Sequence, residues 1–268
     1  MSDQPASFIG SIPENYDRGL GPVFFTDFAD DMARRAAAST PRRVLETCTG
    51  TGIVTRRLRD LLPASTQLMA TDLNPPMLEI ARGKFKPGEA VEFQPADATD
   101  LPFPDQSFDA VVCQFGVMFF PDKEKSYREA YRVLKPSGRY LFSVWDEHRF
   151  NPAPRLVHEL LGGLFPDDPP LFYEVPFAYH RIDPIREAVT EAGFRDFQAA
   201  VRQIDKAVPD MGSFARGLIY GNPVVEQIRM RGGDPDQIVE TLRAALRREF
   251  GDPARVPLQV IIFEATRR

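Results

Sequence analysis

The sequence predicts an α/β domain built on one doubly wound sheet of seven mostly parallel strands. Between residues 44 and 145, short apolar runs of strand length alternate with helical patterns, which is typical of a parallel sheet covered on both faces. The final apolar run follows a long helical stretch, and we expect it to add an antiparallel strand that forms a hairpin with the run before it. The expected strands are residues 43–48, 67–71, 91–94, 108–113, 139–145, 197–204 and 258–265.

The helices between these strands are indicated by their apolar spacing and by their end signals. Val54, Leu58 and Leu61 fall on one face of a helix that follows the first strand. Asn74-Pro75 and Pro121-Asp122 are expected helix starts, because an Asn or Asp cap and a nearby proline both favour helix initiation.

The remaining segments are expected to cover the sheet. Residues 1–40 are expected to form an N-terminal helical lid, and residues 41–268 the binding domain. Two helical insertions, at about residues 146–181 and 207–256, would cover the carboxyl edge of the sheet. The second insertion contains Asp234-Pro235, a cap followed by a proline at the first helical position.

Composition excludes several classes of protein. The 268 residues include 33 basic and 38 acidic side chains, and the formal net charge of −5 offers no attraction to nucleic acid or to an anionic membrane. No stretch reaches 18 apolar residues, and the first residues carry neither a basic nor an apolar signal segment. Two cysteines are too few for a disulfide scaffold. We therefore expect a cytoplasmic protein with no nucleic-acid partner and no membrane insertion.

One turn carries most of the chemical information. The first strand runs into a segment from Glu46 to Gly52 that contains two glycines, Gly50 and Gly52, and a helix follows. Glycines at such a turn let the backbone approach a ligand closely. Asp72 ends the second strand, where a carboxylate can accept hydrogen bonds from both hydroxyls of a ribose. The sequence therefore predicts a nucleoside site.

The same turn indicates which kind of nucleoside. A dinucleotide fingerprint has a third glycine three residues after the second, but here Thr55 stands at that position. The turn also contains no Lys or Arg that could pair with phosphate. These features favour a nucleoside without phosphate groups.

Three segments resemble those of a known family. Val44–Gly52 resembles motif I of the class I S-adenosylmethionine-dependent methyltransferases. Asp97–Asp109 and Arg132–Gly138 resemble the small-molecule branch, methyltransferase type 11, which includes the ubiquinone and menaquinone biosynthesis enzymes. The resemblance covers residues 40–145 and implies a Rossmann-like fold, S-adenosylmethionine as cofactor and methyl transfer to a small molecule.

The resemblance also implies roles for individual residues. Asp72 would hold the ribose, Asp97 would accept from the adenine amine, and Gln114 would lie beside the methionine group and the reacting methyl. The cofactor-binding residues implied in this way are Glu46, Thr47, Cys48, Gly50, Gly52, Asp72, Leu73, Met77, Asp97, Ala98, Cys113 and Gln114.

Cys48 departs from the family pattern, which usually has glycine at this position. A thiol there would narrow the methionine pocket or shift the turn. Cys48 and Cys113 end the first and fourth strands, which this fold places side by side, so we expect the two thiols to be neighbours and oxidants to inhibit. Two small core residues would explain the same positions.

Methyl transfer from a sulfonium needs positioning and exclusion of water more than it needs a nucleophilic residue. A general base helps only where the acceptor loses a proton, and the candidates are His148, His180 and Tyr16. No metal is expected. Aromatic and apolar residues indicate an apolar or aromatic acceptor, and the expected substrate pocket is Tyr16, Phe24, Phe25, Phe115, Met118, Phe119 and Trp145.

Three other functions fit parts of the pattern. A nicotinamide-dependent oxidoreductase would use a similar sheet, but the missing third glycine and the Asp97-Ala98 element count against it. Asn74-Pro75-Pro76 resembles the catalytic motif of nucleic-acid methyltransferases, but it follows the second strand instead of the fourth. A non-catalytic protein that binds S-adenosylmethionine is the third alternative. A homodimer is left open.

Overall fold

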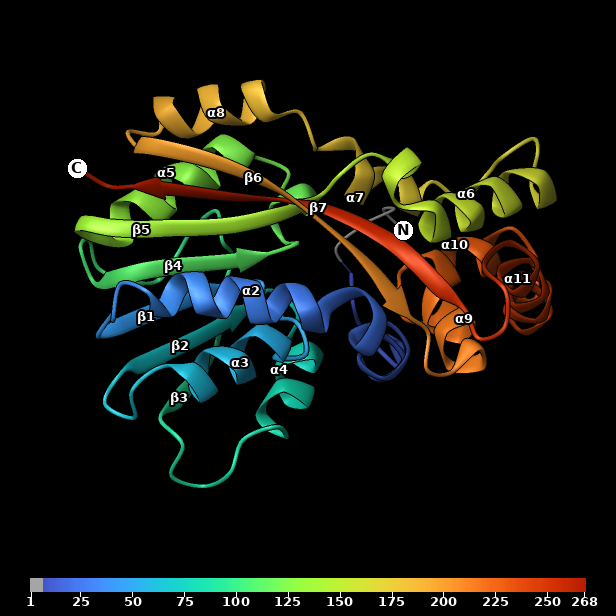
Figure 1. The fold of residues 1–268 in the computed structure, drawn as a ribbon, viewed down its shortest axis with the longest axis horizontal. Coiled ribbons are helices and arrows are strands. Elements are labelled where there is room, and N and C mark those ends of the chain that lie inside the picture. The colour runs from blue at the N-terminus through green and yellow to red at the C-terminus, as the bar shows by residue number, and fades with distance from the viewer. Residues whose placement is uncertain (1–6) are drawn as a thin grey trace.

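The computed structural model describes residues 7–268 and contains one seven-stranded sheet in the order β3-β2-β1-β4-β5-β7-β6 (Figure 1). All strands except β7 run parallel, and β7 lies antiparallel between β5 and β6. This confirms the predicted sheet and its C-terminal hairpin. The strands are β1 (Arg43–Thr47), β2 (Gln67–Asp72), β3 (Val91–Pro95), β4 (Phe108–Gln114), β5 (Leu134–Trp145), β6 (Arg195–Ala207) and β7 (Arg255–Thr266).

Helices cover both faces of the sheet because its central strands are apolar throughout. On β4, Ala110, Val111 and Val112 are all fully buried, which requires cover on each side. The helices α2 (Thr26–Ala37) and α3 (Ile53–Leu61) lie over one face. On the other lie α5 (Lys123–Val133), which Asp122 caps, and α8 (Ile182–Glu191). The helix α4 (Pro75–Arg82) follows β2.

A helical cap stands beyond the carboxyl ends of the parallel strands (Figure 1). The strands β6 and β7 run past the sheet as a two-stranded ribbon that leads into this cap. Asp234 caps the longest helix of the group, as expected, by accepting from the Asp236 amide at 2.9 Å. The cap consists of α6 (Pro152–Leu164), α7 (Val175–Ala178), α9 (Met211–Tyr220), α10 (Val224–Met230) and α11 (Pro235–Phe250), with short 3-10 turns η3 (His148–Phe150) and η4 (Phe172–Glu174).

The segment before α2 packs between the sheet and the cap. It consists of α1 (Ile12–Asn15) and a π-helix, η1 (Tyr16–Phe25). A Cβ placed on Gly217 of α9 would lie 2.8 Å from the Cα of Gly19 in η1, so the two backbones are in direct contact. Residues 1–6 of the expected lid lie outside the described residues.

The fifth strand begins earlier than its apolar run predicts. The strand starts at Leu134, which pairs with Phe108, and the strand register shifts before Arg139. Ser137 has a positive φ of 63° and donates its amide to the Arg267 carbonyl at 2.7 Å. The segment Pro136–Gly138 therefore lies within β5 as a bend, because its backbone is hydrogen-bonded to Arg267 near the end of β7.

Among residues 7–268, no helix combines the length and the apolar character that crossing a bilayer requires.

We expect Gly217→Ala to destabilise the fold by about 1–3 kcal/mol, because the new methyl group meets backbone atoms of Gly19 that cannot move aside. Gly162→Ala is the matched control, since a Cβ in that helix meets nothing within 4 Å, and it should stabilise by about 0.5–1 kcal/mol. Urea unfolding midpoints check both. Equal effects of the two substitutions would contradict the contact between η1 and α9.

Candidate functional site

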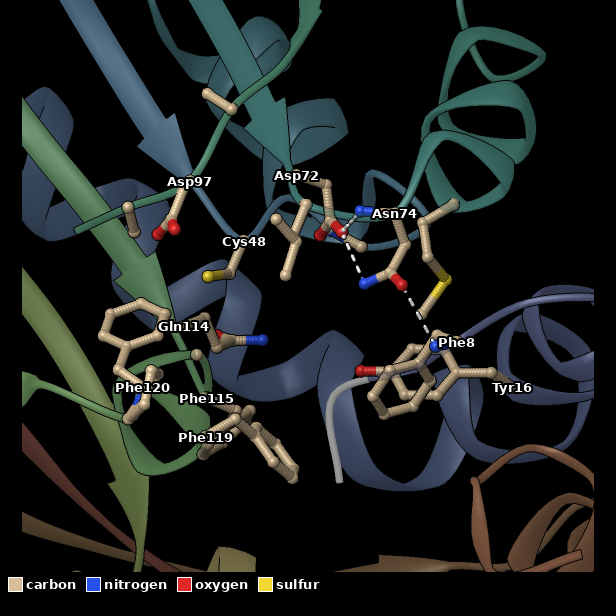
Figure 2. A pocket seen from close by; sticks show the side chains of 17 residues that line it. Phe8, Tyr16, Cys48, Asp72, Asn74, Asp97, Gln114, Phe115, Phe119 and Phe120 are labelled. Carbon is tan, nitrogen blue, oxygen red and sulfur yellow. Dashed lines mark hydrogen bonds between the residues drawn. The ribbon is translucent and has the colours of Figure 1, made fainter. Parts of the chain in front are cut away.

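Three adjoining cavities open at the carboxyl edge of the sheet, where β1, β2 and β4 end. We call them the cleft, the aromatic chamber and the turn pocket. The cleft contains about 850 Å³ of space between protein atoms, part of which is open to solvent. In Figure 2 the carboxylates of Asp72 and Asp97 and the sulfur of Cys48 face this space. Its other lining residues include Gly50, Leu73, Asn74, Met77, Ala98, Gln114 and Gly116.

Asp72 organises the polar wall of the cleft. Its Oδ2 accepts from the Gly50 amide at 2.8 Å, and its Oδ1 accepts from the Asn74 amide at 2.8 Å. Burial raises the pKa of Asp72, and these amide donors oppose the shift. Leu73 is 58% exposed beside it, an unusual state for a leucine and one that suits an apolar ligand face.

The far side of the cleft is formed by the loop after β3. Asp97 both lines the cleft and shapes its own loop, since its Oδ1 accepts from the Thr99 amide and hydroxyl, each at 2.8 Å. Ala98 lies beside it, and Met77 of α4 forms the adjacent apolar wall. A flat heterocycle between these residues would meet one carboxylate at its edge and apolar atoms on its faces.

The turn pocket contains a buried carboxylate with one oxygen that lacks a hydrogen-bond partner. Glu46 is the second-last residue of β1, is only 2% exposed, and its Oε2 has no hydrogen-bond partner among the described residues. Burial raises the pKa of Glu46 to about 8, and the nearby Asp72 adds to the shift. The Oε1 of Gln114 is likewise buried without a partner in the described part of the chain. Two unsatisfied acceptors side by side fit a cationic ligand group that donates hydrogen bonds.

Some of the expected cofactor-binding residues support the site from behind. Gly52 has a φ of 80°, and a Cβ there would lie 2.8 Å from that of Ala81, so it allows α3 and α4 to approach. Thr47 and Cys113 line none of the three cavities. The thiol of Cys113 lies behind that of Cys48, which does line the cleft. Cys48 has a φ of 55°, a conformation that favours glycine.

The aromatic chamber brings together all seven residues expected in the substrate pocket. Phe115 stacks on Trp145 with ring centroids 4.3 Å apart and an interplanar angle of 3°. The 3-10 turn η4 and α7 complete the wall, so the chamber is closed by the helical cap. The residues around it are Tyr16, Phe24, Phe25, Phe115, Met118, Phe119 and Trp145 together with Phe8, Leu20, Phe172, Tyr173, Pro176, Phe177 and Asn222.

Tyr16 and Phe115 line all three cavities and therefore mark the point where they meet. Burial raises the pKa of Tyr16 far above its ordinary value, and the charges of Asp72 and Asp17 add to the shift. Tyr16 consequently keeps its proton at neutral pH. It can donate a hydrogen bond at this junction, but it is a poor general base.

The other two candidates for a general base lie outside the chamber. His148 lines a separate cavity on the far side of Phe177, its ring centroid 4.5 Å from that of Phe177. The Nε2 of His180 lies 3.2 Å from a carboxylate oxygen of Glu147. Because Phe177 separates His148 from the chamber, its imidazole does not reach a molecule bound there.

Several lining residues escaped the sequence analysis. Phe8 closes the space between cleft and chamber: its amide donates to the Asn74 side chain at 3.1 Å, and its ring packs edge-on against Tyr16 and Phe119 (Figure 2). A phenylalanine near the start of the chain has no sequence pattern that reveals this contact. Asn222 and Phe177 reach the chamber from the cap, and only the tertiary fold brings them there.

The resemblance to a nucleic-acid methyltransferase motif disappears in three dimensions. Asn74 precedes the first residue of α4 and bonds to Asp72, while β4 leads into Gln114, Phe115 and Gly116. The Asn-Pro-Pro segment thus has a structural role at a helix start.

Comparison with known proteins identifies the central part of the chain. Residues 45–142 match the family model described as a methyltransferase domain. A demethylmenaquinone methyltransferase from Thermus thermophilus is 46% identical over 105 residues, which cover 39% of this chain and 47% of that protein. A ubiquinone/menaquinone biosynthesis C-methyltransferase from Hahella chejuensis is 39% identical over 115 residues, 42% and 45% of the two chains. The chain thus spans about half the length of these curated relatives.

Solved structures share the fold over a longer range. The YcgJ protein from Bacillus subtilis covers 90% of this chain and 99% of its own, with a TM-score of 0.59 and 22% identity. A Haemonchus contortus phosphoethanolamine N-methyltransferase, solved with phosphomonomethylethanolamine and S-adenosylhomocysteine, covers 95% of this chain and 56% of its own, with a TM-score of 0.62 and 18% identity.

The motifs around Glu46, Asp72 and Asp97, the strand order and these matches lead to one conclusion. Residues 45–142 match the methyltransferase domain family, and the chain shares its fold with solved structures that include an N-methyltransferase bound to S-adenosylhomocysteine.

Proposed function

We propose that this protein transfers a methyl group from S-adenosylmethionine to a small, apolar or aromatic molecule. The observation that carries the proposal is the junction at Tyr16 and Phe115, where the cleft with its two carboxylates, a pocket with an unpaired carboxylate oxygen and an aromatic chamber meet. A donor in the first two cavities and an acceptor in the third would face each other at this point.

The residues present fit this cofactor. Asp72 would hold the ribose, and Asp97, Ala98 and Leu73 would surround the adenine. The unpaired oxygen of Glu46 would accept from the methionine ammonium. When bound, S-adenosylmethionine supplies a methyl group on a positively charged sulfur, which is already activated for displacement.

The chain's own contribution is to position the reactants and to exclude water. Phe8, Phe119 and Phe172 pack edge-on or stacked across the opening, with centroids 6.1–6.5 Å apart. Tyr16 keeps its proton, and the chamber lining includes no histidine or lysine. An acceptor whose own lone pair or electron-rich ring attacks the methyl group suits such a site, because no residue there accepts a proton readily.

The relatives' names support a small-molecule acceptor, since those relatives methylate demethylmenaquinone or act in ubiquinone and menaquinone biosynthesis. No feature favours a nicotinamide cofactor. The absence of a nucleic-acid partner, the possible homodimer, a cytoplasmic location and the partition into residues 1–40 and 41–268 stay predictions.

Calorimetric titration with S-adenosylhomocysteine tests the cofactor, with NADH as the parallel ligand. Asp72→Asn should weaken S-adenosylhomocysteine binding by about 10–100-fold, because one charged acceptor of the ribose hydroxyls is lost. Asp183→Ala, at an exposed carboxylate on α8, is the control and should bind as the parent does. Preference of the folded parent protein for NADH would contradict the proposal.

Glu46 should release a proton when the cofactor binds. With a pKa of about 8 it is protonated at pH 7 in the free protein, and a neighbouring ammonium group favours the carboxylate and lowers that pKa. Affinity should therefore rise from pH 6 to about pH 8 and then level off. Calorimetry in two buffers of different ionisation enthalpy measures the released proton.

Glu46→Gln should remove both the proton release and the pH slope in that range. Glutamine keeps the size of the side chain but cannot ionise, so proton release that persists in this variant would assign it to another group.

Trp145 is the single tryptophan of the chain and lies in the aromatic chamber, so its fluorescence should report acceptor binding. With S-adenosylhomocysteine present, small phenols should quench it saturably, because flat rings can pack against the Phe115–Trp145 stack. The corresponding cyclohexanols, of similar size but not flat, should quench much less. Equal quenching by both series would argue against an aromatic acceptor.

A further inference from the structure

The two cysteines of the chain meet beneath the floor of the cleft. Cys48 follows β1 directly, and Cys113 lies in the neighbouring parallel strand β4, where Glu46 pairs with Val112. This register places Thr47 level with Cys113, so Cys48 lies one residue further on, in the turn after β1. Both cysteines are free thiols.

Their side chains converge on one point. A Cβ placed on Gly116 would lie 2.6 Å from the Sγ of Cys48 and 2.8 Å from the Sγ of Cys113. Only a glycine at position 116 leaves room for both sulfurs. Both sulfurs lie within 3 Å of this one point, so the two thiols are neighbours.

The surroundings favour a negative charge on the inner sulfur. The thiol of Cys48, the side chain of Thr47 and the backbone amides of Gly116 and Val117 donate to Cys113 and lower its pKa despite burial. The pKa of Cys48 is raised because its S–H donates to Cys113 and because the site is buried. Of the two thiols, Cys113 is therefore the one that loses its proton more readily.

The two thiols also differ in access. Cys48 is half-buried and lines the cleft and the turn pocket, whereas Cys113 is fully buried. A small reagent that enters the cleft meets Cys48 first, and Cys113 stands behind it as a second nucleophile. Access to the cleft, and not a low pKa, makes Cys48 the thiol that is attacked, and the buried thiol of lower pKa can resolve it.

We propose that Cys48 and Cys113 are a modification site at which a peroxide closes a disulfide under the cleft. The Cys48 sulfur attacks one peroxide oxygen and becomes a sulfenic acid, while the O–O bond breaks and the leaving hydroxide takes the Cys48 proton as water. The Cys113 thiolate then attacks the Cys48 sulfur, the S–S bond forms, and the departing hydroxide takes up a proton as a second water. Two thiols are oxidised by two electrons, and one hydrogen peroxide is reduced to two waters.

The disulfide would alter the cleft through the turn that carries Cys48. Gly50, two residues later, donates its amide to Asp72, so a displaced turn disturbs the group proposed to hold the ribose. The outward thiol of Cys48 would also be withdrawn toward β4. This consequence, unlike the disulfide itself, rests on the proposed function.

The first experiment needs no ligand. The reduced full-length protein is treated with increasing hydrogen peroxide, and its mass and its peptides are mapped without reduction. We expect loss of the two thiol hydrogens, one peptide pair joined through Cys48 and Cys113, and reversal by dithiothreitol. Extra oxygen on Cys48 with Cys113 still reduced, a disulfide between two chains, or two untouched thiols would each overturn the proposal.

Cys113→Ala is the matched variant, because it keeps Cys48 in the cleft and removes the resolving thiol. In this variant peroxide should leave a sulfenic acid on Cys48 that dimedone labels, whereas the parent protein should show little labelling. Strong and equal labelling of both proteins would mean that Cys113 does not resolve the sulfenic acid.

Titration of the reduced, oxidised and re-reduced parent protein with S-adenosylhomocysteine tests the consequence. Oxidation should weaken binding by at least about ten-fold, and dithiothreitol should restore it. Unchanged affinity in a protein that carries the disulfide would refute the effect on the cleft. A reduced protein that binds no S-adenosylhomocysteine would refute the proposed function, while the disulfide map would still decide the present inference.

Discussion

The site depends on the hydrogen bonds that the carboxylate of Asp72 accepts. One oxygen accepts from the Gly50 amide and so ties the end of β2 to the turn after β1. The other accepts from the Asn74 amide at the start of α4. The Asn74 side chain in turn accepts from the amide of Phe8. The buried carboxylate of Asp72 therefore joins two strand ends, a helix start and the segment that crosses the cleft. A ligand that binds Asp72 would affect the position of all four.

The segment that matches the family model contributes more to the cleft and the turn pocket than to the aromatic chamber. The matched segment, residues 45–142, contains Glu46, Asp72 and Asp97, which line the cleft and the turn pocket. The aromatic chamber takes much of its wall from outside that segment, including Phe24, Trp145 and Phe177. Much of the chamber wall therefore lies outside the segment that the family model matches.

Buried residues at the site have pKa values or backbone angles that differ from the usual ones. Glu46 keeps its proton to higher pH because it is buried and one of its oxygens has no hydrogen-bond partner among the described residues. Tyr16 keeps its proton because the site is apolar and already carries carboxylates. Cys48 occupies a left-handed backbone position, where its thiol rests against Cys113.

The sequence by itself determined the sheet, because apolar strands and capped helices alternate locally. It also determined the cleft, because Gly50 lies in the turn after β1 and Asp72 ends β2, and the form of both segments depends on a few adjacent residues. It also predicted seven residues of the chamber wall from their aromatic or apolar character. The sequence did not determine which of the predicted site residues lie outside the site itself. Gly52 and Cys113 lie behind the cavity walls, and His148 lines another cavity. Only the tertiary structure decided these points, and the roles of Phe8 and Asn222, because contacts between segments so far apart in the chain arise from packing and leave no local pattern.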